Sequence, residues 1–209
     1  MLPRSFYLRD ANTVAPELLG KVLVHRTDAG LAAGRIVEVE AYVGSCDKGA
    51  HSYPNKRTPR TQIQFGPGGY AYVYSIYGMH CCFNVVTGEE NCPEVVLVRA
   101  LEPIKGLDVM AMRRGTDDPV NLCNGPGKLC AALGITKENY GDDLCADRLY
   151  IEEGIQVPGS EICLSPRVNI EYAEECKDYL WRYYIRGNPY VSKVPKRYRG
   201  VVTLGGETL

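Results

Sequence analysis

The sequence predicts a single β-rich α+β domain, and three observations support this fold class. The chain has 209 residues, 45% of them hydrophobic, which is enough to bury one substantial core rather than two small ones. Several short segments alternate apolar and polar residues with the period of a strand. A few segments with helix start and stop signals accompany these strands. We therefore expect one domain that spans residues 1–209.

The first elements of the chain are a short helix and a strand. Thr13 can cap a helix that has Pro16 in its first turn and Gly20 just past its end. Residues 21–26 then read as a strand, and a turn at residues 28–30 leads into a second strand over residues 31–42.

The segment GRIVEVEAY, residues 34–42, places two carboxylates in an otherwise apolar strand. Successive side chains of a strand point to opposite faces. One predicted face carries Arg35, Val37, Val39 and Ala41, and the other carries Ile36, Glu38, Glu40 and Tyr42. Glu40 and Tyr42 then point the same way about 6.6 Å apart, at a rise of about 3.3 Å per residue. One could act on a ligand that the other holds. The alternative is that Glu38 and Glu40 are solvated residues on an exposed face.

A long polar loop, CDKGAHSYPNKRTPRTQ, follows this strand after Gly44. Irregular loops of this length in compact domains are more often functional than mere connectors. His51 lies in the loop, although a lone loop histidine is usually only a surface residue.

Tyrosines dominate the next segment. Tyr70, Tyr72 and Tyr74 fall on one face of a strand. Residues 80–86 form a second strand, and residues 76–79 have the length and the glycine of a hairpin turn, so Tyr77 lies at its tip. An aromatic residue at an exposed turn has little core to pack into, which favours contact with another molecule. Plain cross-strand packing is the alternative for the alternating tyrosines.

Two polar residues interrupt the apolar strands that follow. Asn84 lies between Phe83 and Val85, where a buried amide needs a partner or a purpose. Residues 94–101 form a third strand, with Arg99 near its end. Arg99 is either a salt-bridged structural arginine or a residue that faces the same cavity as Glu40, and spacing leaves both open.

The rest of the chain adds helices and short strands. Helices are expected at residues 104–114, which stop at Gly115, and at residues 126–133, which stop at Gly134. Residues 124–128, NGPGK, offer amides at a helix start and Lys128, which suits a phosphate or a simple structural cap. We expect residues 142–147 to be exposed, and strands near 149–151, 161–164 and 183–186.

Composition limits the possible classes of protein. No run approaches the length of a membrane helix, and the first residues hold no apolar leader, so we expect a cytoplasmic protein and no membrane partner. The nine cysteines lack zinc-ligand spacing, so we expect reduced, buried thiols and no metal or other cofactor.

The net charge of −1 means that any affinity for DNA must come from a local basic patch. Ordinary solvated surface is the alternative for each basic residue. The candidates for the DNA backbone are Arg57, Arg60, Lys128, Arg186 and Lys193. Further basic residues considered for the patch are Arg113, Arg114, Arg182, Lys196, Arg197 and Arg199.

Six motifs in order, GRIVEVEAY, AHS, YVYSIYGM, CFNV, VLVRALEP and NGPGKLC, resemble the alkyladenine (3-methyladenine) DNA glycosylase family. The resemblance runs from LLGK at residue 18 to RGNPYVS at residues 186–192. It implies one domain with a curved, mainly antiparallel, open-barrel-like sheet flanked by short helices. It also implies a monofunctional enzyme, without lyase activity, that removes damaged purines from duplex DNA as a monomer.

The resemblance also implies roles for individual residues. Glu40 matches the carboxylate that orients and deprotonates the attacking water, and Arg99 matches an arginine beside that water. Tyr77 matches a wedge inserted through the minor groove where the base has left the stack.

The base pocket has its own matches. Tyr42 and Tyr74 match opposing aromatic walls, and His51 matches the histidine that hydrogen-bonds the flipped nucleotide. Asn84 matches the residue that crowds the 2-amino group of normal guanine. Aromatic faces would favour a cationic alkylated purine by roughly 0.5–2 kcal/mol per contact.

Two other functions are compatible with parts of the sequence. A non-catalytic module could stack single-stranded nucleic acid on Tyr72, Tyr74 and Tyr77. Such a module has no use for Glu40 near phosphates. A small-molecule hydrolase could use Glu40 and His51, but would not need the basic residues near the end of the chain.

Overall fold

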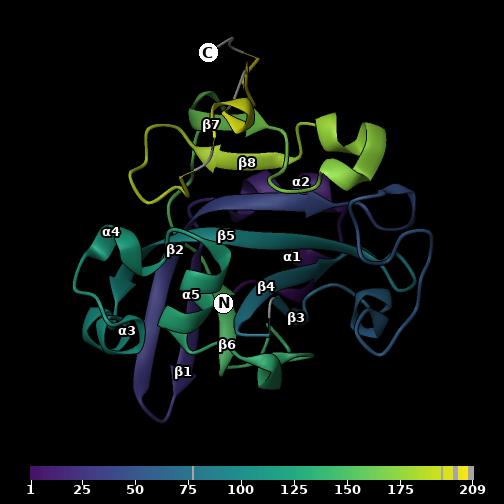
Figure 1. The fold of residues 1–209 in the computed structure, drawn as a ribbon. Coiled ribbons are helices and arrows are strands. Elements are labelled where there is room, and N and C mark those ends of the chain that lie inside the picture. The colour runs from purple at the N-terminus through teal and green to yellow at the C-terminus, as the bar shows by residue number, and fades with distance from the viewer. Residues whose placement is uncertain (77, 194, 200–201, 207–209) are drawn as a thin grey trace.

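The computed structural model describes residues 1–209 except 77, 194, 200–201 and 207–209, and these residues form an open antiparallel sheet with short helices (Figure 1). The strands are β1 (Val22–Thr27), β2 (Gly30–Tyr42), β3 (Ala71–Ile76), β4 (His80–Thr87), β5 (Glu94–Lys105), β6 (Leu149–Glu152), β7 (Ile162–Ser165), β8 (Arg182–Ile185) and β9 (Val202–Thr203). The α-helices are α1 (Arg4–Tyr7), α2 (Ala11–Leu18), α3 (Leu107–Arg114), α4 (Pro119–Leu122) and α5 (Pro126–Leu133). The predicted α+β class with an antiparallel, open sheet is confirmed.

Short 3₁₀ helices lie in the connecting segments. They are η1 (Gly44–Cys46), η2 (Gln62–Phe65), η3 (Lys137–Asn139), η4 (Gly159–Glu161), η5 (Glu171–Asp178) and η6 (Lys196–Tyr198). In the described part of the chain, no helix is both long and apolar enough to cross a membrane.

The sheet is built around β2, the strand that carries GRIVEVEAY. The strand order is β3-β4-β5-β2-β8-β7-β9, and β1 pairs with β2 and β6. One edge of β2 pairs with β5, while its first half pairs with β1 and its second half with β8. A strand hydrogen-bonded along both edges holds its side chains in fixed directions, which suits a site that must keep its geometry.

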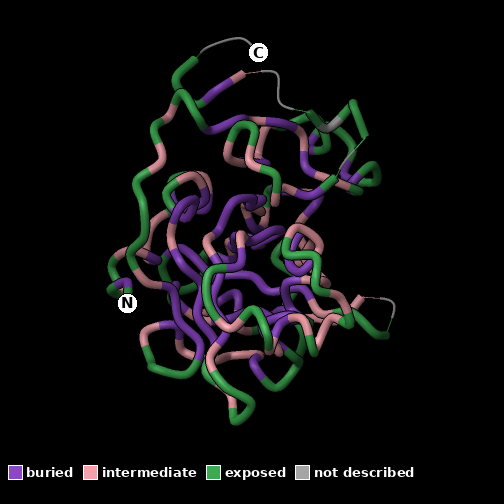
Figure 2. Tube along the Cα trace, turned by 90° about the vertical axis from the view of Figure 1, so that its left-hand side faces the viewer, coloured by how far each residue is buried: buried purple, intermediate pink, exposed green. Residues whose placement is uncertain are grey.

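The strands β2, β4 and β5 each present one face to the main core and the other to a cavity. The core face carries Val39, Ala41, Phe83, Val85, Val96 and Val98, and it packs with apolar residues of α2 and α5. Each fully buried valine or leucine of such a core contributes about 1.5–3 kcal/mol. Figure 2 shows these buried segments inside a layer of exposed loops.

The predicted alternation of β2 fails at one point. Ile36 packs in the same core cluster as Val39 and Ala41, although the pattern placed it on the face of Glu40. The register against β5 shifts between Ile36 and Glu38 and again between Glu38 and Val39. A β-bulge adds an unpaired residue to one strand, so the residues before it point to the opposite face from the one that simple alternation predicts.

The structure corrects three further predictions. Asp10, not Thr13, caps α2, because its side chain accepts the Thr13 N–H at 2.9 Å. The helix expected from residue 104 begins at Leu107, since β5 runs on to Lys105 and Gly106 turns the chain with φ 74°. The segment 142–147 is not uniformly exposed: Asp143 pairs with Arg4 at 2.6 Å, and only residues 146 and 147 are exposed.

Candidate active site

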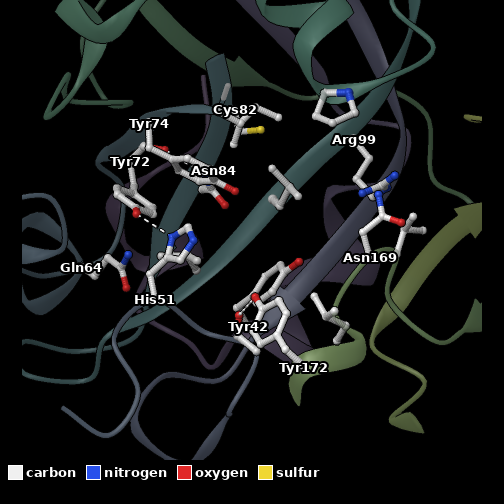
Figure 3. Close-up of a pocket in the computed structure, with 17 residues that line it drawn as sticks. Tyr42, His51, Gln64, Tyr72, Tyr74, Cys82, Asn84, Arg99, Asn169 and Tyr172 are labelled. Carbon is white, nitrogen blue, oxygen red and sulfur yellow. Dashed lines mark hydrogen bonds between the residues drawn. The ribbon is translucent and has the colours of Figure 1, made fainter. Parts of the chain in front are cut away.

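A cavity of about 340 Å³ opens on the second face of the sheet (Figure 3). This volume lies in the range of roughly 300–1,000 Å³ that is typical of small-molecule sites. Among its lining residues are Tyr42, His51, Tyr72, Tyr74, Asn84 and Arg99. The structure therefore brings together five of the predicted site residues, Tyr42, His51, Tyr74, Asn84 and Arg99, from β2, β3, β4, β5 and the polar loop.

Glu40 lies behind the cavity wall rather than on it. Its carboxylate is fully buried, and it is held by three residues that line the cavity. Oε2 accepts the Tyr42 hydroxyl at 2.9 Å, Oε1 accepts the Val168 N–H at 2.8 Å, and Arg99 Nη1 lies 3.3 Å from Oε1. All three groups are donors, so they suit an ionised carboxylate. The alternative of a solvated Glu40 is wrong.

Arg99 joins the two carboxylates of β2. Its Nε donates to Glu38 Oε1 at 2.9 Å while its Nη1 faces Glu40. Burial disfavours the charge, but Glu40 and Glu38 outweigh it and raise the pKa of Arg99 above its ordinary value. Arg99 is thus both a salt-bridged arginine and a cavity residue, so both alternatives left open by the sequence hold.

Tyr42 is fixed from both sides. Its hydroxyl donates to Glu40, and the guanidinium of Arg167 stacks on its ring at 4.5 Å. Burial and the charge of Glu40 raise the pKa of Tyr42 well above its ordinary value, so the hydroxyl keeps its proton. Arg167 is itself fully buried and donates two hydrogen bonds to the buried Asp47. The Arg167–Asp47 pair therefore supports the Tyr42 ring from the side that faces away from the cavity.

His51 makes contacts through both ring nitrogens. Nδ1 lies 2.8 Å from the Tyr72 hydroxyl, and Arg60 Nη2 lies 3.0 Å from Nε2 and 3.3 Å from Nδ1. Burial and the charge of Arg60 lower the pKa of His51 to about 4. The imidazole is therefore neutral at pH 7, and its ring lies edge-on to Tyr74 at 4.7 Å.

Two tyrosines of β3 differ in their exposure to the solvent. Tyr72 is only 1% exposed, while Tyr74 is half-buried and carries the Arg60 guanidinium 4.6 Å above its ring. Asn84 pairs directly opposite Tyr72 in the sheet and donates to the Tyr72 carbonyl at 3.0 Å. A ring as buried as Tyr72 cannot serve as a platform for single-stranded bases, which argues against the binding-module alternative.

Comparison with known proteins assigns most of the chain to one family. Residues 5–189 match the family described as "Methylpurine-DNA glycosylase (MPG)". The chain belongs to the methylpurine-DNA glycosylase family. A Clostridium acetobutylicum protein named "Putative 3-methyladenine DNA glycosylase" is 53% identical over 203 residues, covering 93% of this chain and 98% of its own. Proteins of the same name from Desulfitobacterium hafniense and Bacillus cereus strain Q1 are 51% and 50% identical, each covering 91% of this chain and 98% of their own. The resemblance seen in the motifs is thereby confirmed.

In this methylpurine-DNA glycosylase, a segment that sequence reasoning missed forms one side of the cavity. Val168, Asn169, Ile170 and Tyr172 all line it, although they lie more than 120 residues from Glu40. Asn169 has φ 61°, a left-handed conformation that is uncommon for a residue other than glycine. The Tyr172 hydroxyl donates to the Gly49 carbonyl at 3.3 Å and so links this segment to the polar loop.

The basic residues expected at the DNA backbone lie in different settings. Arg57, Arg60, Arg186 and Lys193 are exposed. Lys128 is half-buried and donates to the Asn124 side chain at 2.7 Å, while the N-cap residue of α5, Gly125, makes no side-chain cap hydrogen bond. Tyr77, expected at the tip of the β3–β4 hairpin, lies outside the described residues.

Three other arginines considered for a basic patch serve the fold. Arg182 is buried against Glu38. Arg113 and Arg114 donate to the backbone carbonyls of Ala132 and Leu122. The charges of these three residues are therefore directed to groups of the protein itself.

The cysteines match the expectation of reduced thiols. All nine are free, and five of them are buried. Burial raises the pKa of Cys82, Cys123 and Cys130, which keeps these thiols protonated. Within the described ranges, no group of three or more metal-binding side chains is present.

Proposed function

We propose that this DNA glycosylase of the methylpurine family excises 3-methyladenine and related alkylated purines from duplex DNA, with Glu40 activating the water. The observation that supports this most strongly is the buried Glu40 carboxylate, which Tyr42 and Arg99 hold directly behind the wall of an aromatic cavity. We propose further that residues 1–209 act as one domain and as a monomer. The reaction initiates base excision repair of chromosomal DNA, which lies in the cytoplasm of bacteria such as the named relatives.

The proposed reaction is a hydrolysis at C1′ of the damaged nucleotide. The N-glycosidic bond breaks, and its electron pair leaves with the base, so an alkylated purine that was cationic leaves as a neutral molecule. Water bonds to C1′ and gives one proton to Glu40. Glu40 also stabilises the positive charge that develops on the sugar, and Arg99 holds its carboxylate in place. The mechanism needs no amine nucleophile, so we propose no lyase activity.

The pocket explains why the enzyme would prefer alkylated purines. Alkylation at N3 or N7 makes the base cationic, and the rings of Tyr42 and Tyr74 offer negative faces to it. A neutral His51 does not repel that charge. We propose that the flipped nucleotide hydrogen-bonds to His51 Nε2 in place of Arg60, and that Asn84 crowds the 2-amino group of normal guanine.

Deaminated and etheno-bridged purines form a second proposed class of substrate. Such bases are neutral and leave more easily when a group donates to them. A pKa of about 4 makes His51 a poor acid at pH 7, so it could offer these bases a hydrogen bond but not a proton.

The enzyme must first reach a base that is stacked inside the duplex. Extrusion costs a few kcal/mol, and less for a damaged base. We propose that Tyr77 fills the gap left by the base. We also propose that Arg57, Arg60, Lys128, Arg186 and Lys193 contact the phosphates.

The experiment that tests this function is an incubation with alkylated duplex DNA, followed by alkali to reveal abasic sites and by chromatography of the released bases. Release of 3-methyladenine with alkali-sensitive sites, and no strand breaks before alkali, is the expected result. Parallel incubations with duplexes that contain hypoxanthine or etheno-adenine show which other lesions the enzyme excises. Binding of single strands without release of any base would overturn the proposal in favour of a binding module.

A further inference from the structure

Glu38 is a buried carboxylate to which the proposed chemistry assigns no role. It is fully buried on β2, two residues before Glu40. A carboxylate leaves water at a cost of several kcal/mol unless donors replace the lost hydration. The reason for its presence in the interior must therefore lie in its partners.

Four donors converge on Glu38. Oε1 accepts from Arg99 Nε at 2.9 Å, from Arg182 Nε at 2.7 Å and from the Ser192 hydroxyl at 2.8 Å. Oε2 accepts the Ser192 N–H at 2.8 Å. Burial alone would raise the pKa of Glu38, but the two arginines and Ser192 outweigh it and lower that pKa. Glu38 is consequently a fixed negative charge that three distant segments hold in place.

The contacts of Arg99 are unequal. Its hydrogen bond to Glu38, at 2.9 Å, is shorter than its 3.3 Å contact with Glu40. A planar guanidinium can grip one carboxylate through two parallel N–H groups. Here the bond from Nε to Glu38 turns the plane so that Nη1 reaches Glu40. Without Glu38, the free energy of pairing would favour a two-point contact between Arg99 and Glu40. Each oxygen of Glu40 already accepts one hydrogen bond, from Tyr42 or Val168, so this contact would take up acceptor positions that are needed to activate water.

We propose that Glu38 is the positioning residue of this site: it holds Arg99 in an orientation that supports Glu40 without neutralising it. The inference rests on the proposed function of Glu40. It also links the chain end to the chemistry, because Ser192 contributes two of the four donors and follows the exposed Arg186 by six residues.

A purely structural role is the competing explanation, because Glu38 also balances the buried charge of Arg182. Both roles predict some loss of thermal stability when the carboxylate is removed. Only the positioning role requires that the loss of rate in a Glu38 variant arise from a displaced Arg99, and therefore that it disappear when Arg99 is already absent. Changes that act through the same residue are not additive.

The test measures single-turnover release of 3-methyladenine, with enzyme in excess, for the wild type, Glu38→Gln, Arg99→Gln and the double variant. Glu38→Gln should slow release by up to about 100-fold, as misplacement of a group in the site does, while the Kd for the same duplex changes by less than about twofold. The double variant should be no slower than Arg99→Gln. Ser192→Ala removes one donor and should give a smaller loss in the same direction.

The matched control is Glu102→Gln. Glu102 pairs with Arg35 at 2.7 Å across the same two strands, outside the cavity, and this variant should release base at the wild-type rate. Unchanged release by Glu38→Gln, or losses that multiply in the double variant, would overturn the inference. If Glu40→Gln also releases base at the wild-type rate, the proposed function itself fails. If only Glu40→Gln is inactive, the proposed function stands and the role of Glu38 falls.

Discussion

The neutral state of His51 predicts a specific dependence of stability on pH. Burial and Arg60 lower its pKa from 6.5 to about 4. In the unfolded chain the imidazole takes up its proton below about pH 6.5, whereas the folded protein takes it up only near pH 4. Between these values the unfolded state binds more protons, so stability rises with pH there and falls as the solution is acidified.

The size of the effect follows from the two pKa values. A difference between 6.5 and about 4 corresponds to about 3 kcal/mol of folding free energy, at about 1.36 kcal/mol for each pKa unit. The loss should begin near pH 6.5 and be complete near pH 4. Arg60→Gln removes the second cause of the lowered pKa, so it should raise the pKa of His51 and weaken this dependence.

An NMR titration of the imidazole signals measures these pKa values directly. The chain has three histidines, and the loss of a signal in His51→Gln assigns the one of interest. His80 is exposed, and burial lowers the pKa of His25. A His51 that titrates near pH 6.5 in the folded protein, or one that is unaffected by Arg60→Gln, would refute the account of its environment.

Three further predictions concern the back of the pocket, the wedge and the DNA backbone. Asp47→Asn leaves the buried charge of Arg167 unpaired, which should cost about 3–5 kcal/mol and lower Tm by roughly 6–20 °C, at about 2–4 °C per kcal/mol. Tyr77→Ala should weaken capture of the flipped base with the pocket intact, seen as a lower fluorescence of 2-aminopurine beside the lesion. The logarithm of the affinity for duplex DNA should fall linearly with the logarithm of salt concentration, as phosphate contacts require.

Each of these predictions has a control or a contrary outcome. Glu17→Gln breaks an exposed pair with Arg9 and should change stability by less than about 1 kcal/mol, so a similar change in Asp47→Asn would contradict the buried-pair account. An unchanged flipping signal in Tyr77→Ala would remove the wedge role. A flat salt response would mean that the exposed basic residues do not contact phosphates.

The elements that sequence predicted well are those set by local pattern. Alternation placed the strand with Glu40 and the tyrosine-rich hairpin, and the proline and glycine signals placed α5 at Pro126–Leu133. The same alternation put Ile36 on the wrong face. A β-bulge beside Glu38 shifts which residues point to each face, and the order of apolar and polar residues does not reveal it. The local pattern also left the burial of Glu38 open, since burial depends on which distant donors arrive.

The parts of the site that were missed come from long-range contacts. Arg167 meets Asp47 across 120 residues, and the Val168 N–H meets Glu40 across 128 residues. Both lie in a loop after β7 with no periodic pattern. The sequence of this loop, SPRVNI, alternates Arg167 and Asn169 with the apolar Val168 and Ile170, and nothing in so short a run shows that Arg167 is buried. The convergence of Tyr42, His51, Tyr74, Asn84 and Arg99 was foreseen only through the family resemblance.

The central claim is that the Glu40 carboxylate performs chemistry rather than holding DNA. Its most direct test is single-turnover release of 3-methyladenine by Glu40→Gln, alongside the affinity of the same variant for the lesion duplex. The account predicts that release slows by about 10²- to 10⁴-fold, the range for a positioned general base, while the duplex still binds with nearly the wild-type Kd. Release at the wild-type rate by Glu40→Gln would contradict it.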